Sequence, residues 1–309
     1  MTTSGTTAFD LDFTEIAEEA WERAGREMRS GYDLRTARRS MNLMTIEWQN
    51  RGINMWTIEQ GSFPLTAGLN TYPLPVDTID LLEHVIRTGQ GTASTQADLS
   101  ITRISMPTYA TIPNKLQPAR PIQVMVQRMS GQTNSTSLRL SGALSDSATT
   151  VPLDSTAGLA ASGYIKLDSE VIYYGFVSGN TLTSCFRAQN NTTAATHTDL
   201  TAVYVPQLPA ITVWPTPDNV TTYTFVYWRL RRVQDAGAGV ETADMNFRFL
   251  PAVTAGLAYY IAMKVPELQP RLDMLKMVYE EQFDMAAGED REKASIRFVP
   301  RQSFIGGGT

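Results

Sequence analysis

The chain has 309 residues, a formal net charge of −5 and a sequence pI near 5.2. This length is sufficient for one large domain or two ordinary ones, each with a buried core. The chain is acidic and has no block of five or more basic residues. These features argue against a protein that binds nucleic acid by neutralising its phosphates. Its two arginine clusters are interpreted as solvated or ion-paired surface: Arg35, Arg38 and Arg39, and Arg229, Arg231 and Arg232.

Cysteine and histidine usage limits the chemistry further. A single cysteine excludes a disulfide within the chain, and only two histidines accompany it, so a Cys/His zinc site is not expected. The N-terminal residues form neither a basic nor an apolar segment, and no apolar run approaches the ~18 residues of a membrane span. We therefore expect no signal peptide, no membrane partner and synthesis in a cytoplasm.

Two amphipathic helices are predicted near the N-terminus. The first begins at Asp12, which forms a capping-box pair with Glu15, and it is expected to end at Gly31. The second begins after Asp33, a favourable N-cap, and ends before Gly52, a suitable C′ residue. Apolar residues recur at spacings of three and four along both segments, which predicts the core face of an αα-hairpin and not a cofactor site.

The next part of the chain, residues 56–128, is predicted to be extended and interrupted by turns. Residues 121–128 have the pattern of a strand, and residues 99–105 alternate in the same manner. Pro73 and Pro75 hold the short apolar run after the turn at residues 66–71 in an extended conformation. These segments predict a β-platform that follows the helices.

A change of composition marks residues 131–205, which are rich in Thr, Ser, Gly, Asn and Ala and poor in charge. Short strands are predicted at residues 137–140, 164–167, 171–177, 181–184 and 201–204. The turn at residues 178–180 joins two of them in a hairpin. Strands resume at residues 209–218 and 223–232, which fit the platform sheet better than this module. Residues 131–205 are therefore interpreted as an inserted all-β module.

The C-terminal part returns to helical periodicity. Residues 249–264 form one predicted helix, ended by Pro266, and a second begins near Pro270 and runs to about Gly288. The sequence thus predicts an α+β fold, in which a helical bundle, a β-platform and a small inserted all-β domain precede an extended tail. The expected division is a body of residues 1–130 and 206–294, the module 131–205, and the tail 295–309.

No pattern in the sequence predicts an enzyme. The chain has no GxSxG, Walker A or HExxH motif, and no GxGxxG after a strand. His197 is interpreted as a loop histidine and not as a general base. Cys185, at the end of a predicted strand, is interpreted as a small buried apolar residue. We expect no catalytic residue, cofactor or metal.

Several segments resemble, in the same order, the head-to-tail adaptor proteins of short-tailed bacteriophages, a group that includes the tail tubular protein A type. The resembling segments are residues 48–52, 65–77, 101–121, 213–218 and 250–264, together with the helices that they end or begin. They are distributed along the chain from the first predicted helix to residue 264. The module resembles β-modules of phage tail proteins through residues 166–174 and 185–197. It departs from them at Ala188, where many versions have Gly.

This resemblance implies a ring, twelve-fold in that family, which docks on the portal, extends the DNA channel and carries the tail nozzle or tail fibre proteins. Such a protein belongs to the virion, at the head–tail junction, after assembly in the host bacterial cytoplasm. A lumen that conducts DNA should not hold it, so we expect carboxylates and uncharged polar groups from the helices to line it. The module should face outward. The alternative is a tail or baseplate protein whose module contacts a host glycan or a tail fibre.

The C-terminal tail has apolar residues without helical period, too few to form a core. The residues expected to bind the portal are Ile296, Arg297, Phe298, Val299, Arg301, Phe304 and Ile305. One interpretation is a disordered terminus. The other is a segment that becomes ordered on the portal, in which the two phenylalanines fill pockets and the two arginines pair with carboxylates. The resemblance favours the second, because adaptors of this kind grip the portal through C-terminal extensions.

Overall fold

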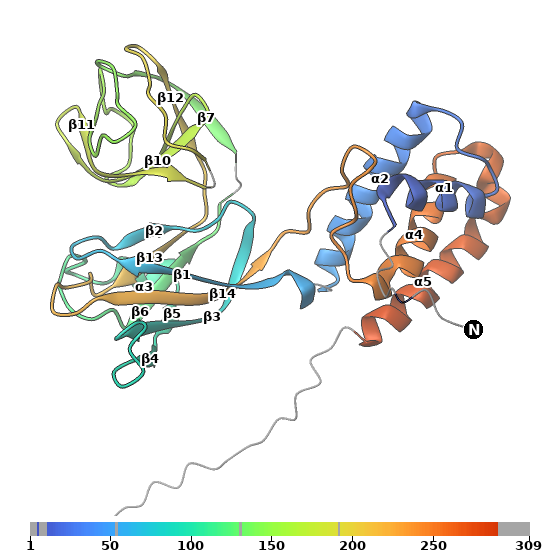
Figure 1. Cartoon of the computed structure of the whole chain (residues 1–309), viewed down its shortest axis with the longest axis horizontal. Coiled ribbons are helices and arrows are strands. Elements are labelled where there is room, and N and C mark those ends of the chain that lie inside the picture. Colours follow the sequence, from blue (N-terminus) through green and yellow to red (C-terminus); the bar gives the residue numbers. More distant parts are fainter. Residues whose placement is uncertain (1–4, 6–10, 53–54, 130–131, 191, 290–309) are drawn as a thin grey trace, which may run out of the picture. The chain divides into compact units, whose positions relative to one another are not determined.

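The computed structural model describes residue 5 and residues 11–52, 55–129, 132–190 and 192–289 (Figure 1). The chain divides into two compact units. The helical unit comprises Met1–Trp56 and Val233–Thr309, and the β unit comprises Thr57–Arg232. Helices and sheets both contribute substantially to the described part, so the predicted α+β class is confirmed.

The helical unit is built from segments at opposite ends of the sequence. Its helices are α1 (Phe13–Ala24), α2 (Gly31–Asn50), α4 (Leu250–Ala262) and α5 (Leu272–Glu289), with the short 3₁₀ helices η2 (Phe247–Phe249) and η3 (Pro266–Arg271). A further 3₁₀ turn, η1 (Met55–Thr57), lies at the end of the N-terminal segment. The helices α1, α2 and α5 all pack on α4 (Figure 1), which has no charged residue and is buried along most of its length.

The capping box predicted for α1 is confirmed, whereas its predicted end is wrong. Asp12 Oδ1 accepts from the Glu15 backbone N–H at 2.8 Å, and Glu15 Oε2 accepts from the Asp12 N–H at 3.1 Å. The helix ends at Ala24, well before Gly31. Gly25 adopts a left-handed conformation with φ +99° and donates its N–H to the carbonyl groups of the preceding turn. Glycine adopts this conformation without the steric cost of a Cβ, so the helix stops at the first glycine available.

The start of α2 also differs from the prediction. Ser30 is the N-cap: its Oγ accepts from the Asp33 backbone N–H at 3.3 Å. Asp33 lies inside the first turn, where its Oδ2 accepts from the Arg29 N–H at 3.2 Å and from the Ser30 hydroxyl. A carboxylate in the first turn is favourable beside the positive end of the helix dipole, so Ser30 and Asp33 both contribute to this helix start. At the other end, Gly52 has φ +83°, as its predicted role requires.

Aromatic side chains fill the core where α2, α4 and α5 meet. Trp48 is 1 % exposed, and its ring lies 5.4 Å from those of Phe249 and Phe283. Its indole N–H donates to the Tyr279 hydroxyl at 2.7 Å, so the buried polar atom has a partner. Gly256 of α4 allows this approach, because a methyl group there would lie 2.5 Å from Met44 Sδ and 2.7 Å from Tyr279 Cε2.

The β unit contains a platform of two four-stranded sheets. The first has the order β1 (Ile58–Leu65), β14 (Tyr223–Arg231), β3 (Thr78–Thr88), β4 (Ala97–Ser100). The second has the order β2 (Thr71–Pro73), β13 (Ala210–Trp214), β6 (Gln123–Gln127), β5 (Thr102–Ile104), and a short helix α3 (Met106–Ala110) follows β5. The expected single strand at 99–105 is wrong: Leu99 pairs with Ile86 in the first sheet, whereas Ile104 runs parallel to Met125 in the second.

A six-stranded sheet contains the strands predicted between residues 131 and 205. Its order is β7 (Thr133–Arg139), β12 (Ala202–Pro206), β9 (Gly163–Leu167), β10 (Glu170–Ser178), β11 (Thr181–Gln189), β8 (Val151–Pro152). The predicted hairpin is confirmed, since β10 and β11 pair with Ser178 opposite Thr181. The strand β8 was not predicted, because two residues are too short to show an alternating pattern. We call residues 131–205 the module.

Strand pairing brings distant segments of the chain together in both sheets of the platform. Ile58 of β1 lies opposite Leu230 of β14, so the chain begins and ends the β unit on neighbouring strands. Gln127 of β6 lies opposite Ala210 of β13, so the chain also leaves and rejoins the platform on neighbouring strands. Residues 131–205 are therefore a sequence excursion between two paired strands.

The module strands β9 and β10 are buried on both faces. Ile165, Leu167 and Tyr174 belong to the core of the module, whereas Tyr164 and Tyr173 belong to the core of the platform. A strand that is covered on both sides has a continuous apolar sequence and not an alternating one, as in residues 171–174. Among the described helices, none has the length and apolarity that a crossing of the bilayer would require.

The close packing at Gly256 gives a direct test of the helical core. Gly256→Ala should lower the free energy of unfolding by about 1–3 kcal/mol, because the methyl group must displace Met44 or the Tyr279 ring. Gly288→Ala makes the same change on α5, where no atom of the described residues outside the helix's own backbone lies within 4 Å of the added methyl group, and it should stabilise by up to about 1 kcal/mol. Urea unfolding followed by tryptophan fluorescence measures both. Equal effects of the two substitutions would contradict this packing.

Candidate functional site

The seven residues predicted to bind the portal all lie outside the described part of the chain. These residues are Ile296, Arg297, Phe298, Val299, Arg301, Phe304 and Ile305. Their role therefore stays a prediction. In the described residues, two other places are candidate sites: a pocket in the helical unit and a buried charge cluster in the β unit.

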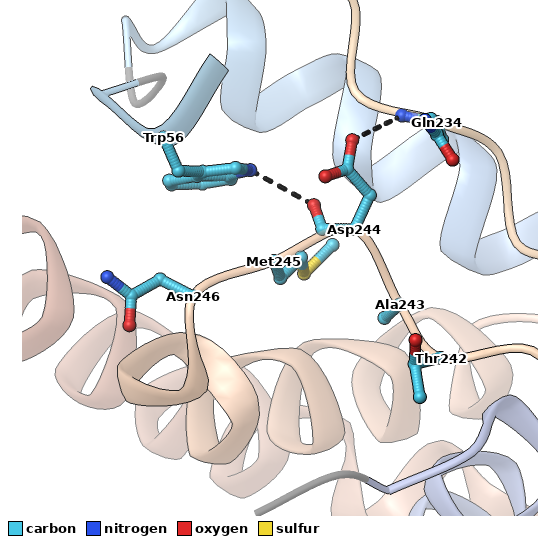
Figure 2. Close-up of a pocket in the computed structure, with 7 residues that line it drawn as sticks. All are labelled: Trp56, Gln234, Thr242, Ala243, Asp244, Met245 and Asn246. Atoms are coloured by element: carbon cyan, nitrogen blue, oxygen red, sulfur yellow. Dashed lines mark hydrogen bonds between the residues drawn. The ribbon is translucent and has the colours of Figure 1, made fainter. Parts of the chain in front are cut away.

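A pocket of about 530 Å³ lies in the helical unit (Figure 2). Its lining residues are Trp56, Gln234, Thr242, Ala243, Asp244, Met245 and Asn246. The Trp56 indole N–H donates to the Asp244 carbonyl oxygen at 3.0 Å, and the Gln234 backbone N–H donates to Asp244 Oδ2 at 2.9 Å. Asp244 is the only titratable side chain in this lining, so the pocket offers no pair of acid and base. The hydrogen bond from Trp56 to Asp244 links the segment before η2 to the end of the N-terminal segment.

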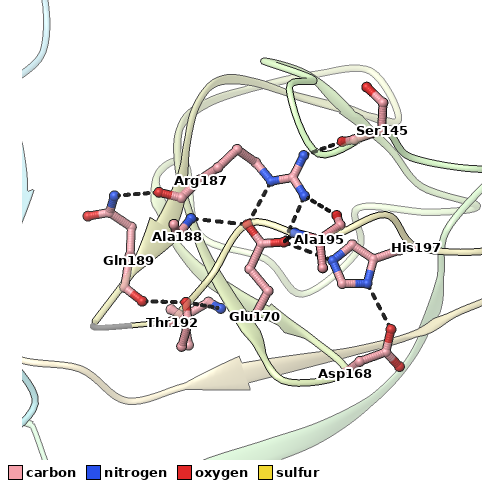
Figure 3. Close-up of polar contacts among 10 residues, drawn as sticks. Ser145, Asp168, Glu170, Arg187, Ala188, Gln189, Thr192, Ala195 and His197 are labelled. Carbon is pink, nitrogen blue, oxygen red and sulfur yellow. Dashed lines mark hydrogen bonds and ion pairs between the residues drawn. The ribbon is translucent and has the colours of Figure 1, made fainter.

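The second place is a buried charge cluster in the module (Figure 3), centred on Glu170 at the start of β10. Glu170 is 0 % exposed. Arg187 of β11 approaches it with two parallel hydrogen bonds, from Nε to Oε1 at 2.8 Å and from Nη2 to Oε2 at 2.7 Å. A bidentate pair of this kind fixes both side chains in one geometry, which is favourable when the ions are removed from water together.

Three further donors complete the environment of Glu170. Its Oε1 accepts from the Ala188 backbone N–H at 3.0 Å, and its Oε2 accepts from the Ala195 N–H at 3.0 Å and lies 2.9 Å from His197 Nε2. Burial alone would raise the pKa of Glu170. The hydrogen bonds from Arg187, His197 and the two backbone amides outweigh burial and lower the pKa to about 2. Glu170 is therefore a carboxylate throughout the physiological range.

His197 lies between two carboxylates. Its Nδ1 is 2.8 Å from Asp168 Oδ2, while its Nε2 faces Glu170. Each ring nitrogen therefore lies within hydrogen-bond distance of a carboxylate oxygen, which fixes the orientation of the imidazole. The backbone of His197 also exchanges hydrogen bonds with Leu144. The sequence predicted a loop histidine, and the structure shows in addition that this residue is 3 % exposed, with a carboxylate oxygen beside each ring nitrogen.

The cluster ties three segments of the module together. Arg187 also donates to the carbonyl oxygens of Ala195, at 2.7 Å, and of Ser145. Strands β10 and β11 are thereby linked to the loops at residues 145 and 195–197. The polar atoms of the residues drawn in Figure 3 face one another. Within the described residues, no group of three or more His, Cys, Asp or Glu side chains is arranged to hold a metal ion. The arrangement is suited to holding the module together.

Ala188 is the position at which the resemblance described above predicts glycine. Its backbone has φ +54°, a left-handed conformation that is costly for a residue with a Cβ. The conformation directs the Ala188 N–H at Glu170 Oε1. This requirement explains why glycine suits the position.

Two further predictions are confirmed. Cys185 is buried, and burial raises the pKa of its thiol to about 11, so it is not a reactive thiolate at neutral pH. The second arginine cluster is ion-paired: Arg229 lies 2.8 Å from Glu59 and 2.5 Å from Asp77, and Arg231 lies 2.6 Å from Glu59.

The sequence contained a signal for the buried cluster that was not used. Glu170 directly precedes the continuous apolar run of the strand predicted at residues 171–177, and a buried carboxylate requires partners. Arg187 and His197 both lie in the segment 185–197 that was noted for its resemblance. Only the pairing of β10 with β11 shows that these residues meet.

None of the family models searched matches the chain, and no curated protein matches it. The function is therefore inferred from the sequence and structure of the chain itself.

Lowering the pH should reduce the free energy of unfolding of the module, because Glu170 becomes protonated. Because the folded pKa of about 2 lies below the ordinary value of 4.5, the stabilisation is complete above pH 4.5 and is lost as the pH falls toward 2. The loss should reach about 3 kcal/mol. Urea unfolding, followed at the methyl resonances of Ile165 and Ile172, measures it.

Glu170→Gln should remove this acid dependence and destabilise the module at neutral pH by about 3 kcal/mol or more, because the buried Arg187 loses its counter-ion. Asp146→Asn, at an exposed position of the same module, should change neither the acid dependence nor the stability at neutral pH. An unaltered acid slope in Glu170→Gln would contradict the assignment.

The left-handed backbone of Ala188 gives another test. Ala188→Gly removes the steric cost of the Cβ, which exceeds the added entropy of the unfolded glycine, so the module should gain up to about 1 kcal/mol. Ala161→Gly, at an exposed residue outside the left-handed region, should instead cost about 0.5–1 kcal/mol. The same urea experiment compares them, and a loss of stability in Ala188→Gly would count against the explanation.

Proposed function

We propose that the chain is a head-to-tail adaptor of a short-tailed bacteriophage, a structural protein of the virion and not an enzyme. The observation that carries the proposal is the order of the resembling segments, from residues 48–52 to residues 250–264. In this role copies of the chain form a ring on the portal, extend the channel for the DNA and support the tail nozzle or fibre proteins.

The segment at residues 65–77 supports a structural role. The Tyr72 hydroxyl accepts from the Thr66 backbone N–H at 2.9 Å and donates to the Leu69 carbonyl oxygen at 2.7 Å, which closes the turn. Leu69, Tyr72 and Leu74 are buried in the platform core. The resemblance is therefore carried by residues that hold the platform together, as expected for a component of an assembly.

The architecture proposed for the adaptor has a body of residues 1–130 and 206–294, with the helices as a bundle, and an inserted module of residues 131–205. The antiparallel pairing of β6 with β13 supports the insertion, because the platform sheet is continuous without the module. We place the module on the outside of the ring, since a domain of this size in the lumen would obstruct DNA.

Exposed carboxylates support an acidic channel. Glu15, Glu18 and Glu22 lie exposed on the outer face of α1. Repetition around a ring would line the channel with negative charge, which repels phosphates and allows the duplex to pass. The formal net charge of −5 per chain has the same sign.

Deletion of residues 295–309 tests the proposal. The truncated chain should keep its circular dichroism spectrum and its melting temperature but no longer co-sediment with portal dodecamers. Phe298→Ala with Phe304→Ala should weaken binding about tenfold or more, as the loss of two pocket-filling side chains would. The matched control is Gln302→Ala with Ser303→Ala, which should bind as the full chain does.

The outcomes separate the two candidate classes. Undiminished docking of the truncated chain would exclude the tail as the portal contact. A full-length chain that leaves portal dodecamers unbound and adheres to host cells would instead identify a tail or baseplate protein that binds a receptor.

A further inference from the structure

The outward face of α2 is unusually apolar and basic for a solvent-exposed helix. Opposite its buried face lies a stripe of exposed residues: Tyr32, Arg35, Arg39, Leu43 and Ile46. Tyr32 is 63 % exposed, and Leu43 and Ile46 are exposed for more than half of their surface. Three large apolar residues along one helix face indicate a surface that is covered in the functional state.

The outward face of α5 has the complementary composition. Its exposed stripe consists of Met274, Met277, Glu281, Met285 and Gly288, with Asp284 beside it. Met277 is 65 % exposed. The buried residues of α5, such as Leu275 and Tyr279, point into the helical core on the other side of the helix. This stripe is therefore also free to meet a partner.

The two stripes match when the helices run in opposite directions. From Tyr32 forward, the α2 stripe has spacings of three, four, four and three residues, and from Gly288 backward the α5 stripe has the same spacings. The resulting pairs are Tyr32 with Gly288, Arg35 with Met285, Arg39 with Glu281, Leu43 with Met277, and Ile46 with Met274. Spacings of three and four keep residues on one helix face, so all five pairs can form in a single contact.

The charges on these faces lack counter-ions within the described residues. Arg35 Nε contacts only the Gly31 carbonyl oxygen, at 3.3 Å, and Arg39 contacts the Thr36 hydroxyl at 3.4 Å. In the described part of the chain, Glu281 and Asp284 take part in no ion pair. Lys264 lies near this face as a further basic group, and burial and the neighbouring Arg39 both lower the pKa of its amino group. The antiparallel match places Glu281 opposite Arg39 and Asp284 near Arg35.

We propose that α2 of one copy packs antiparallel against α5 of a second copy through these stripes. The partner is this chain itself, because its own surface carries both the matching spacing and the opposite charge. The inference deepens the proposed function and rests on it only for the closure of successive contacts into a ring. Two different faces meet in a heterologous contact, and such contacts propagate around a ring or along a filament.

The same stripes disfavour a two-fold contact of either helix with itself. An antiparallel α2 pair centred on the stripe would place Arg39 opposite the second Arg39, and the corresponding α5 pair would place Glu281 opposite Glu281. Like charges in such positions are repulsive. In the ring, α2 and α5 would form the lateral contact, which leaves the carboxylates of α1 for the channel.

Disulfide trapping tests the contact in the full-length chain. Ile46→Cys and Met274→Cys are made separately, and the native Cys185 is buried and does not compete. Mixed together under mild oxidation, the two variants should form a disulfide-linked dimer, whereas neither should do so alone. The control mixes Met274→Cys with Glu18→Cys, an exposed position of α1, and should give at least about tenfold less product. A single chain with both Ile46→Cys and Met274→Cys should give a ladder of higher oligomers.

Charge reversal provides the second measurement. Arg39→Glu should reduce the trapped product about tenfold or more, because it places two carboxylates together, and addition of Glu281→Arg in the same chain should restore it. Preferential Ile46→Cys homodimers, a mixed yield equal to the Glu18→Cys control, or no rescue by the double reversal would overturn the proposal.

Failure of this contact and failure of the adaptor role are distinguishable. Co-sedimentation of the wild-type chain with portal dodecamers tests the adaptor role and does not depend on cysteine variants. Portal binding without the mixed disulfide would remove only the proposed lateral contact. A mixed disulfide without portal binding would establish the self-contact and remove the adaptor role.

Discussion

The pairing of β1 with β14 is the constraint on which the rest of the chain depends. Because Ile58 lies opposite Leu230, the chain leaves the platform beside the strand on which it entered. The helices at the two ends of the sequence can therefore share one core. The pairing of β6 with β13 repeats this arrangement within the β unit. Two nested excursions thus give a chain of 309 residues three separate apolar cores.

The helical unit and the module are each held together by a different kind of contact. In the helical unit, Trp48 and Tyr279 join α2 to α5 across 231 residues of sequence, and Gly256 admits their close approach. In the module, β10 is covered on both faces, so its one carboxylate, Glu170, needs five hydrogen-bond donors from neighbouring segments. The helical core thus depends on shape complementarity, and the module depends in addition on satisfied charge.

Local signals in the sequence were sufficient to place most helices and strands, and they failed where two local solutions competed. Both Gly25 and Gly31 could end α1, and both Ser30 and Asp33 could cap α2; sequence spacing does not choose between them. Residues 99–105 were predicted as one strand but form two, because the two halves of the segment pair in different sheets. The Glu170 cluster was not predicted because Arg187 and His197 lie 17 and 27 residues away and meet only through strand pairing.

The central claim is that this chain is a ring-forming adaptor, and electron microscopy of portal dodecamers mixed with the full-length chain tests it most directly. Class averages should show an added ring of density, coaxial with the portal and continuing its channel. Portal particles that remain unchanged in an excess of the chain, or density bound off the axis, would contradict the claim.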